Sequence, residues 1–284
     1  MEGPSILVAS MSTPQPRGRS RALWQYHSRS DLHSKVACWG VLFDLLCESR
    51  LLRRHATRGK IVLAVNEKMR DFSTGREKTL DLVIARPSAR MSQSAGSLAA
   101  RAQAWGIVLS AAQQRQMSLL PDIYQGPVGA VLMALEAKAT MTEHGKARPR
   151  LYDELNSSHL TVHGASRQAL AVGLVMVNMA STFVSPDLNP NPPKPGRRAT
   201  VSAHSQPEAT EGVIEKIREI PRRSSTQGHG YDGLGLVVVD APNDNVTPVK
   251  LVAAPPAPQQ GDVLHYDTMI TRVANEYDTR FVNI

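Results

Sequence analysis

Residues 128–139 read VGAVLMALEAKA, a run of small and apolar side chains that ends in a carboxylate and an ammonium group. The apolar run from Val128 to Leu135 is typical of a buried strand. Because side chains at positions i and i+2 of a strand point to the same face, Glu136 and Lys138 are expected to lie together. Ala137, between them, presents only its backbone to the same neighbourhood. This segment therefore predicts both a strand and a polar site at its end.

The segments around this strand predict an α/β core over residues 31–183. Apolar residues at three- and four-residue steps indicate helices over residues 31–54 and 149–163, with Pro149 suited to the first helical position. Short apolar runs indicate four strands: 61–65, 79–86, 128–139 and 170–178. The order helix, three strands, helix, strand predicts a three-layer unit in which helices cover both faces of the sheet.

The rest of the chain is predicted to add to a core at residues 21–185. Residues 1–20 are expected to be disordered, and residues 87–127 form an insertion that is partly helical. The stretch at 186–207 is rich in proline and polar residues, which predicts a linker or loop. The C-terminal extension, residues 208–284, contains segments typical of two helices and a strand, which either complete the sheet or cap it.

Composition narrows the class of protein. The 33 Lys and Arg residues exceed the 25 Asp and Glu residues, and the formal charge of +8 favours a polyanionic partner. Cys38 and Cys47 lie in one apolar segment without metal-ligand spacing, which is typical of reduced residues in an intracellular protein. The most apolar run, residues 169–184, is shorter than the ~20 residues of a membrane span. We therefore expect a cytoplasmic protein with no membrane partner.

A second carboxylate is expected beside the first. Asp81 heads the apolar run at residues 82–84, and two such strands side by side would gather Asp81, Glu136 and Lys138. Two carboxylates and the peptide carbonyl of Ala137 are oxygen ligands suited to Mg²⁺, with Mn²⁺ able to substitute. Lys138 would assist the attacking water or stabilise a phosphate in the transition state. The trio predicts a metal site for phosphodiester hydrolysis.

These residues, in this order of elements, resemble the PD-(D/E)XK nuclease superfamily of restriction and repair endonucleases over residues 31–183. The resemblance implies a restriction-endonuclease-like fold with a mixed sheet, and a Mg²⁺-dependent deoxyribonuclease that binds DNA. It implies Asp81 and Glu136 as metal ligands, Ala137 as a backbone ligand and Lys138 as the catalytic lysine. A homodimer is favoured, because cutting both strands of a duplex is simplest with two active sites.

The sequence departs from the superfamily pattern at the first acidic position. Leu80 stands where the pattern has proline, and a long segment separates Asp81 from Glu136. A literal Pro-Asp pair exists at Asp122, at an acceptable spacing to Glu136, but little room remains there for a complete strand. Asp81 is preferred as the first metal ligand, and Asp122 remains the alternative.

Three further residues are secondary candidates. The first helix of the superfamily often contributes an acid, so Glu48 either supports the metal or lies solvated at the rim of an apolar face. Lys146 and Arg150 lie near the start of the second helix, where phosphate binding is physically natural. The simpler interpretation of Arg150 is a surface pair with Glu154 at the i,i+4 spacing.

Two other patterns carry weaker expectations. His159 and His163 share a helix face but lack the HExxH motif, so packing or surface roles are expected. Residues 228–233, GHGYDG, match GxGxxG but precede a strand, which is the wrong context for a dinucleotide site. The alternative function, in a different class, is a non-catalytic nucleic-acid-binding or assembly protein in which Glu136 and Lys138 form an ordinary salt bridge.

Overall fold

A mixed sheet of six strands organises the computed structural model, which describes residues 1–17, 21–89, 96–189, 191–193 and 199–284. The strand order is β10-β9-β6-β5-β4-β3. Strands β5, β6 and β9 are parallel to one another, and the remaining neighbours pair antiparallel. The strands of this sheet are β3 (Val62–Arg70), β4 (Glu77–Pro87), β5 (Val128–Thr140), β6 (Leu170–Asn178), β9 (Gly233–Asp240) and β10 (Lys250–Val252).

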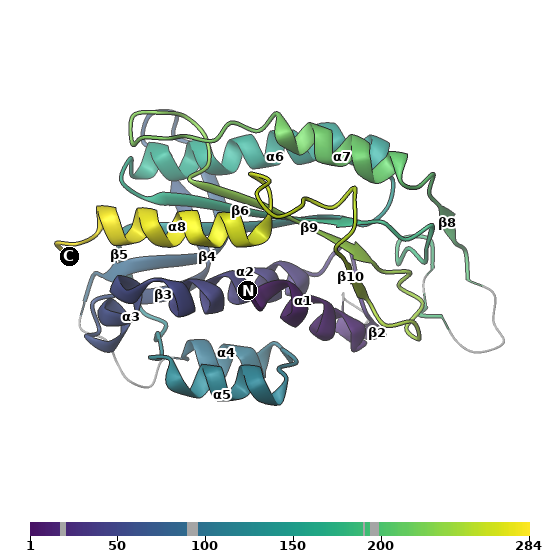
Figure 1. Ribbon diagram of the computed structural model, residues 1–284, viewed down its shortest axis with the longest axis horizontal. Helices are drawn as coiled ribbons and strands as arrows, with labels where there is room; N and C mark the ends of the chain where they lie inside the picture. Colours follow the sequence, from purple (N-terminus) through teal and green to yellow (C-terminus); the bar gives the residue numbers. More distant parts are fainter. Residues whose placement is uncertain (18–20, 90–95, 190, 194–198) are drawn as a thin grey trace.

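Helices cover both faces of this sheet (Figure 1). One layer contains α1 (Gly3–Ser12), α2 (Leu32–Glu48), α3 (Arg50–Thr57) and α8 (Tyr266–Arg280), and the other contains α6 (His144–Ala165) and α7 (Glu208–Arg218). Because both faces are covered, every residue of β6 is buried, as expected for a parallel strand in the middle of a sheet. The predicted α/β class and the order helix, three strands, helix, strand are confirmed in α2, β3, β4, β5, α6 and β6.

The two core helices differ from their predicted bounds. The helix predicted over 31–54 is divided at Ser49, whose backbone is extended and whose Oγ accepts a hydrogen bond from the Leu52 amide, so that a new helix begins. The helix predicted to begin at Pro149 begins at His144 and carries the proline within it. A proline this near the start removes a single backbone hydrogen bond, which the helix tolerates.

The predicted disorder of residues 1–20 is wrong for most of that segment. Residues 3–12 form α1, whose Ile6, Leu7 and Met11 are buried against the core. The Asp44 carboxylate, on α2, accepts hydrogen bonds from the amides of Glu2 and Gly3 at 2.8 and 2.7 Å. A carboxylate from 41 residues away therefore caps α1, which is why the local sequence does not predict the helix. Two short strands follow α1, β1 (Gln15–Arg17) and β2 (Ala22–Trp24), while residues 18–20 lie outside the described residues.

The C-terminal extension completes the sheet, since β9 pairs with β6 and β10 closes that edge. In the insertion, α4 (Leu98–Ala104) and α5 (Ala111–Leu119) lie outside the layer of α2 and α3 (Figure 1). The Trp39 Nε1 of α2 donates to the Leu98 carbonyl at 2.9 Å, which ties the insertion to the core.

The described parts of the Pro-rich stretch at 186–207 contact the rest of the fold. Its β8 (Ser202–Ala203) pairs with β7 (Thr182–Phe183), and Asn189 is buried. Residues 90–95 of the insertion, together with 190 and 194–198 of this loop, lie outside the described residues.

In the part of the chain that the structure describes, no helix has both the length and the apolar character needed to cross a bilayer. Cys38 and Cys47 are free thiols.

Candidate active site

Strands β4 and β5 separate in the middle of the sheet. Their pairing ends where Leu82 lies opposite Leu135. Beyond that point β4 remains paired with β3 as far as Glu77, and β5 remains paired with β6 as far as Thr140. The ends of β4 and β5 therefore diverge, and the backbone of β5 that faces β4 lacks ladder partners there. We call this region, formed by Asp81, Glu136, Ala137 and Lys138, the fork.

The predicted residues meet at the fork. The Asp81 Oδ2 accepts a hydrogen bond from the Ala137 amide at 2.8 Å, which replaces the missing ladder bond. Glu136 is only 4% exposed, and its Oε1 lies 2.6 Å from the Lys138 Nζ. Its second oxygen, Oε2, is buried and has no hydrogen-bond partner among the described residues. The i and i+2 positions of β5 thus form an ion pair between a buried carboxylate and a half-buried lysine, with one carboxylate oxygen left unsatisfied.

Burial and charge perturb the groups at the fork. Burial, and then the negative charge of Glu136, raise the pKa of Asp81 to about 7. Burial lowers the pKa of Lys138, but the Glu136 carboxylate beside it outweighs that effect, so the net pKa is raised. At neutral pH Lys138 is therefore a cation, while Asp81 is present in both its protonated and its ionised form. Such perturbation is common at functional sites and also occurs in structural ion pairs.

Helix α6 supplies a second layer over the fork, which the sequence did not predict. The Lys138 Nζ also lies 3.5 Å from the Glu154 Oε2. Lys78, on β4, donates to the Glu154 carbonyl at 2.6 Å and lies 3.9 Å from the Glu136 Oε1. Burial lowers the pKa of Lys78, although Glu136 partly offsets that effect. Two lysines therefore flank one buried carboxylate, and no local pattern in the sequence marks Lys78.

The N-terminus of α2 approaches the fork from the opposite layer. The Ser34 Oγ donates to the Ala137 carbonyl at 3.3 Å. Asp31, which precedes α2 and pairs with Lys35 at 2.7 Å, adds to the effects of burial and Glu136 that raise the Asp81 pKa. Glu48 instead lies exposed at the other end of the 17-residue helix, about 25 Å away at 1.5 Å per residue. Asp31, at the start of α2, therefore contributes a charge that acts on Asp81, and Glu48 has the solvated position.

Asp122 lies away from the fork. Its Oδ1 accepts hydrogen bonds from the amides of Ala99 and Ile123 at 3.3 and 3.0 Å, beside the start of α4. The adjoining Tyr124 carbonyl accepts from the Leu63 amide at the outer edge of β3, and β4 lies between β3 and β5. The structure therefore brings Asp81, and not Asp122, to Glu136.

A cavity of about 380 Å³ opens next to Lys138. Lys146, Arg150 and Glu154 line it, together with Thr140, whose Oγ1 is buried and has no partner within the described part of the chain. Arg150 donates to the Glu154 Oε1 at 2.6 Å, which is the simple surface pair expected from the i,i+4 spacing. The Arg150 side chain is nevertheless 82% exposed, so its other donors remain accessible from the cavity. The cavity joins the fork at Lys138, and its lining carries acidic as well as basic groups, since Lys146 pairs with Glu143 at 2.9 Å.

The oxygen atoms at the fork fit a hard divalent cation. Mg²⁺ is held in proteins by a few carboxylates together with water and phosphate oxygens. The fork offers two carboxylates, one with an unsatisfied buried oxygen, and the Ala137 carbonyl, which faces the same side as the amide that Asp81 binds. In the described residues no group of three His, Cys, Asp or Glu side chains is arranged as a metal site, so water and substrate would complete the coordination.

Comparison of the chain with protein-family models, with curated proteins and with solved structures finds no match. The chain is an α/β protein with a mixed sheet, and its central strands diverge around two carboxylates and two lysines.

Proposed function

We propose that this protein is a Mg²⁺-dependent DNA endonuclease of the PD-(D/E)XK type. The observation that carries the proposal is the fork itself. Asp81, Glu136 and Lys138 meet where β4 and β5 stop pairing, inside the element order typical of that superfamily. The restriction-endonuclease-like version of the α/β fold is part of the same proposal.

In the proposed reaction the protein would bind the cation, orient the substrate and stabilise the charge on the phosphate. Asp81 and Glu136 would hold the cation through carboxylate oxygens, with the Ala137 carbonyl as the third protein ligand. When bound, Mg²⁺ supplies Lewis acidity and lowers the pKa of a coordinated water. In the hydrolysis a water would lose a proton to solvent as its oxygen bonds to phosphorus, one phosphorus–ester oxygen bond would break, and the leaving oxygen would take a proton from solvent. Lys138, a cation at neutral pH, stabilises the charge that develops on the phosphate.

The charges near the fork suit a phosphodiester substrate. Lys146 and Arg150 border the cavity that opens beside Lys138, and the net charge of the chain is +8. Phosphates bound there release counterions, so DNA affinity should fall steeply as salt rises. Lys146 and Arg150 would thus extend the proposed site from Lys138 into the adjoining cavity.

The test is cleavage of supercoiled plasmid and linear DNA by purified protein in Mg²⁺, in Mn²⁺ and in EDTA. The parent is expected to nick or fragment DNA in either metal and not in EDTA. Lys138→Ala and Glu136→Gln should lose cleavage, while Asp122→Asn, the matched acidic control away from the fork, should retain it. Cleavage by Lys138→Ala at the parental rate would refute the assignment of that lysine.

DNA binding without cleavage in any metal would instead support the non-catalytic nucleic-acid-binding protein. The homodimer expected from double-strand cleavage remains a prediction, which light scattering with and without a DNA duplex would test.

A further inference from the structure

A second and larger cavity, of about 640 Å³, lies at the C-terminal end of α6. Its walls come from the turn between β3 and β4, the end of α6 and the loop before β9, segments that are far apart in the sequence. Its volume falls within the roughly 300–1,000 Å³ of typical small-molecule sites. The cavity contains residues of both patterns that the proposed nuclease function leaves unused: His163 of the histidine pair and His229 of the GHGYDG segment.

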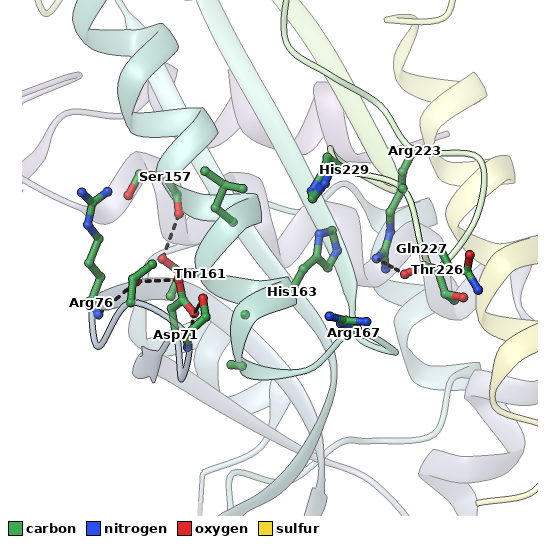
Figure 2. Close-up of a pocket in the computed structure, with 16 residues that line it drawn as sticks. Asp71, Arg76, Ser157, Thr161, His163, Arg167, Arg223, Thr226, Gln227 and His229 are labelled. Atoms are coloured by element: carbon green, nitrogen blue, oxygen red, sulfur yellow. Dashed lines mark hydrogen bonds between the residues drawn. The ribbon is translucent and has the colours of Figure 1, made fainter.

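Basic groups gather on one side of this cavity. Figure 2 shows His163, Arg167, Arg223 and His229 on that side, while Asp71, Arg76, Ser157 and Thr161 lie on the other. The Asp71 carboxylate is the acidic group of the lining, and it already accepts hydrogen bonds from Ser73 and Thr74 at 2.6 to 2.8 Å. Asp71 keeps its negative charge, because its hydrogen-bond donors are neutral, but it lies beside Arg76 across the cavity from the basic side.

The basic side is built on a buried anchor. Asp232 is fully buried, and its Oδ1 accepts from the Arg223 Nε at 2.9 Å and lies 2.7 Å from an Arg280 nitrogen. Its Oδ2 lies 3.3 Å from the His163 Nε2, which fixes the orientation of that ring. The anchor holds Arg223 and His163 in place without ligand, as a pre-formed site requires.

The positive charge around the anchor exceeds the negative charge. The carboxylates of Asp232 and Glu276 balance the guanidiniums of Arg223 and Arg280. Arg167, exposed at the mouth, makes no ion pair with any residue that the structure describes. The Arg223 guanidinium makes one hydrogen bond from each nitrogen, leaving two of its five N–H donors without an acceptor among the described residues.

We propose that this cavity binds a phosphate group, as inorganic phosphate or as the phosphate of a small phosphorylated molecule. Arg167 and His229 would contact the anion directly, and Arg223 would contribute its buried charge. Guanidinium groups suit phosphate because their planar donors match its oxygens. The site is separate from the fork and does not depend on the proposed nuclease function.

The test is isothermal titration of the full-length protein with inorganic phosphate and with a 5′-deoxynucleoside monophosphate, at constant ionic strength. Arg167→Gln, at an exposed position, should leave the fold intact and raise the Kd for phosphate about tenfold, the loss of one charge-assisted hydrogen bond. His229→Gln should weaken binding in the same direction. Arg58→Gln, an exposed arginine of the segment after α3, is the matched control and should bind as the parent does.

Each outcome decides the proposal. Tighter binding of the nucleotide than of phosphate identifies a phosphorylated nucleoside as the better ligand, and equal binding identifies the phosphate alone. An absence of saturable binding by the parent overturns the proposal, as does an Arg167→Gln variant that binds like the parent. Loss of binding in Lys138→Ala with retention in Arg167→Gln would move the phosphate to the fork. Phosphate binding by a protein that cleaves no DNA would leave this site in place and refute only the nuclease.

Discussion

Substituting Asp81 by asparagine is expected to stabilise the metal-free protein at neutral and alkaline pH while destroying metal binding. Burial and the Glu136 charge raise the pKa of Asp81 to about 7, which means that the fork disfavours the ionised carboxylate. An asparagine carries no charge, and its side-chain oxygen can still accept the hydrogen bond from the Ala137 amide. The substitution therefore removes the unfavourable charge and keeps the contact.

The pH range follows from the two pKa values. In the unfolded chain the carboxyl loses its proton near 3.8, whereas in the native protein it keeps the proton up to about 7. Between these pH values the native state binds more protons, so the free energy of unfolding of the parent falls as pH rises. A rise of about three in pKa, at about 1.4 kcal/mol each, gives an upper limit of about 4 kcal/mol. Below about pH 4 this contribution disappears, because both states are protonated.

The assay is urea unfolding at about pH 4, 6 and 8 in EDTA, repeated in Mg²⁺. Asp81→Asn should gain at least about 1 kcal/mol over the parent at pH 8 and little at pH 4. Mg²⁺ should stabilise the parent and leave Asp81→Asn unchanged, since a ligand stabilises only the state that binds it. Asp122→Asn, an acidic position away from the fork, is the control and should keep the parental stabilisation by Mg²⁺. A difference between parent and Asp81→Asn that is absent, or equal at all pH values, would refute the reasoning.

Further substitutions test the stability of the fork, of α1 and of the buried anchor. Lys138→Ala leaves the buried Glu136 carboxylate without its 2.6 Å partner, so urea unfolding in EDTA should show a loss of about 1–3 kcal/mol that adding Glu136→Gln largely recovers. Asp44→Ala removes the acceptor of two α1 amides and of the Tyr266 hydroxyl, so stability should fall by about 3 kcal/mol and α1 amides should exchange hydrogen faster, while Tyr266→Phe should cost about 1 kcal/mol. Asp232→Asn leaves the buried Arg223 guanidinium without its carboxylate, while Arg280 keeps Glu276, and thermal unfolding should reveal a loss of about 3–5 kcal/mol; a loss below 1 kcal/mol would show that the anchor is dispensable.

The sequence predicts the strand that carries Glu136 and Lys138 because both signals are local. An apolar run of this length has few ways to be buried, and the alternation of side chains along a strand places i and i+2 on one face. The proximity of Asp81 was also predictable, from the order of elements, since consecutive antiparallel strands usually pair. These inferences depend on residues that are close in the chain or adjacent in the topology.

Other features depend on partners that no local pattern shows. Residues 3–12 are helical because Asp44 caps them and α2 buries their apolar side chains, although the segment is short and arginines follow it. The helix break at Ser49 lies inside a segment in which the apolar residues keep a helical spacing on both sides of the break. At the N-terminus a tertiary contact outweighs the propensity of the segment, whereas at Ser49 a local cap interrupts the helix.

For this protein, sequence alone determined the α/β class, the order of the core elements and the pairing of Glu136 with Lys138, because side-chain periodicity is a property of the backbone itself. Only the tertiary structure decided that β4 and β5 part at Leu82 and Leu135, that Lys78 and Glu154 join the fork, and that Asp31 replaces Glu48 as its acidic neighbour. The raised pKa of Asp81 was likewise decided by the tertiary structure. Burial and the distance to other charges are set when remote segments pack together, and they have no counterpart in the order of residues along the chain.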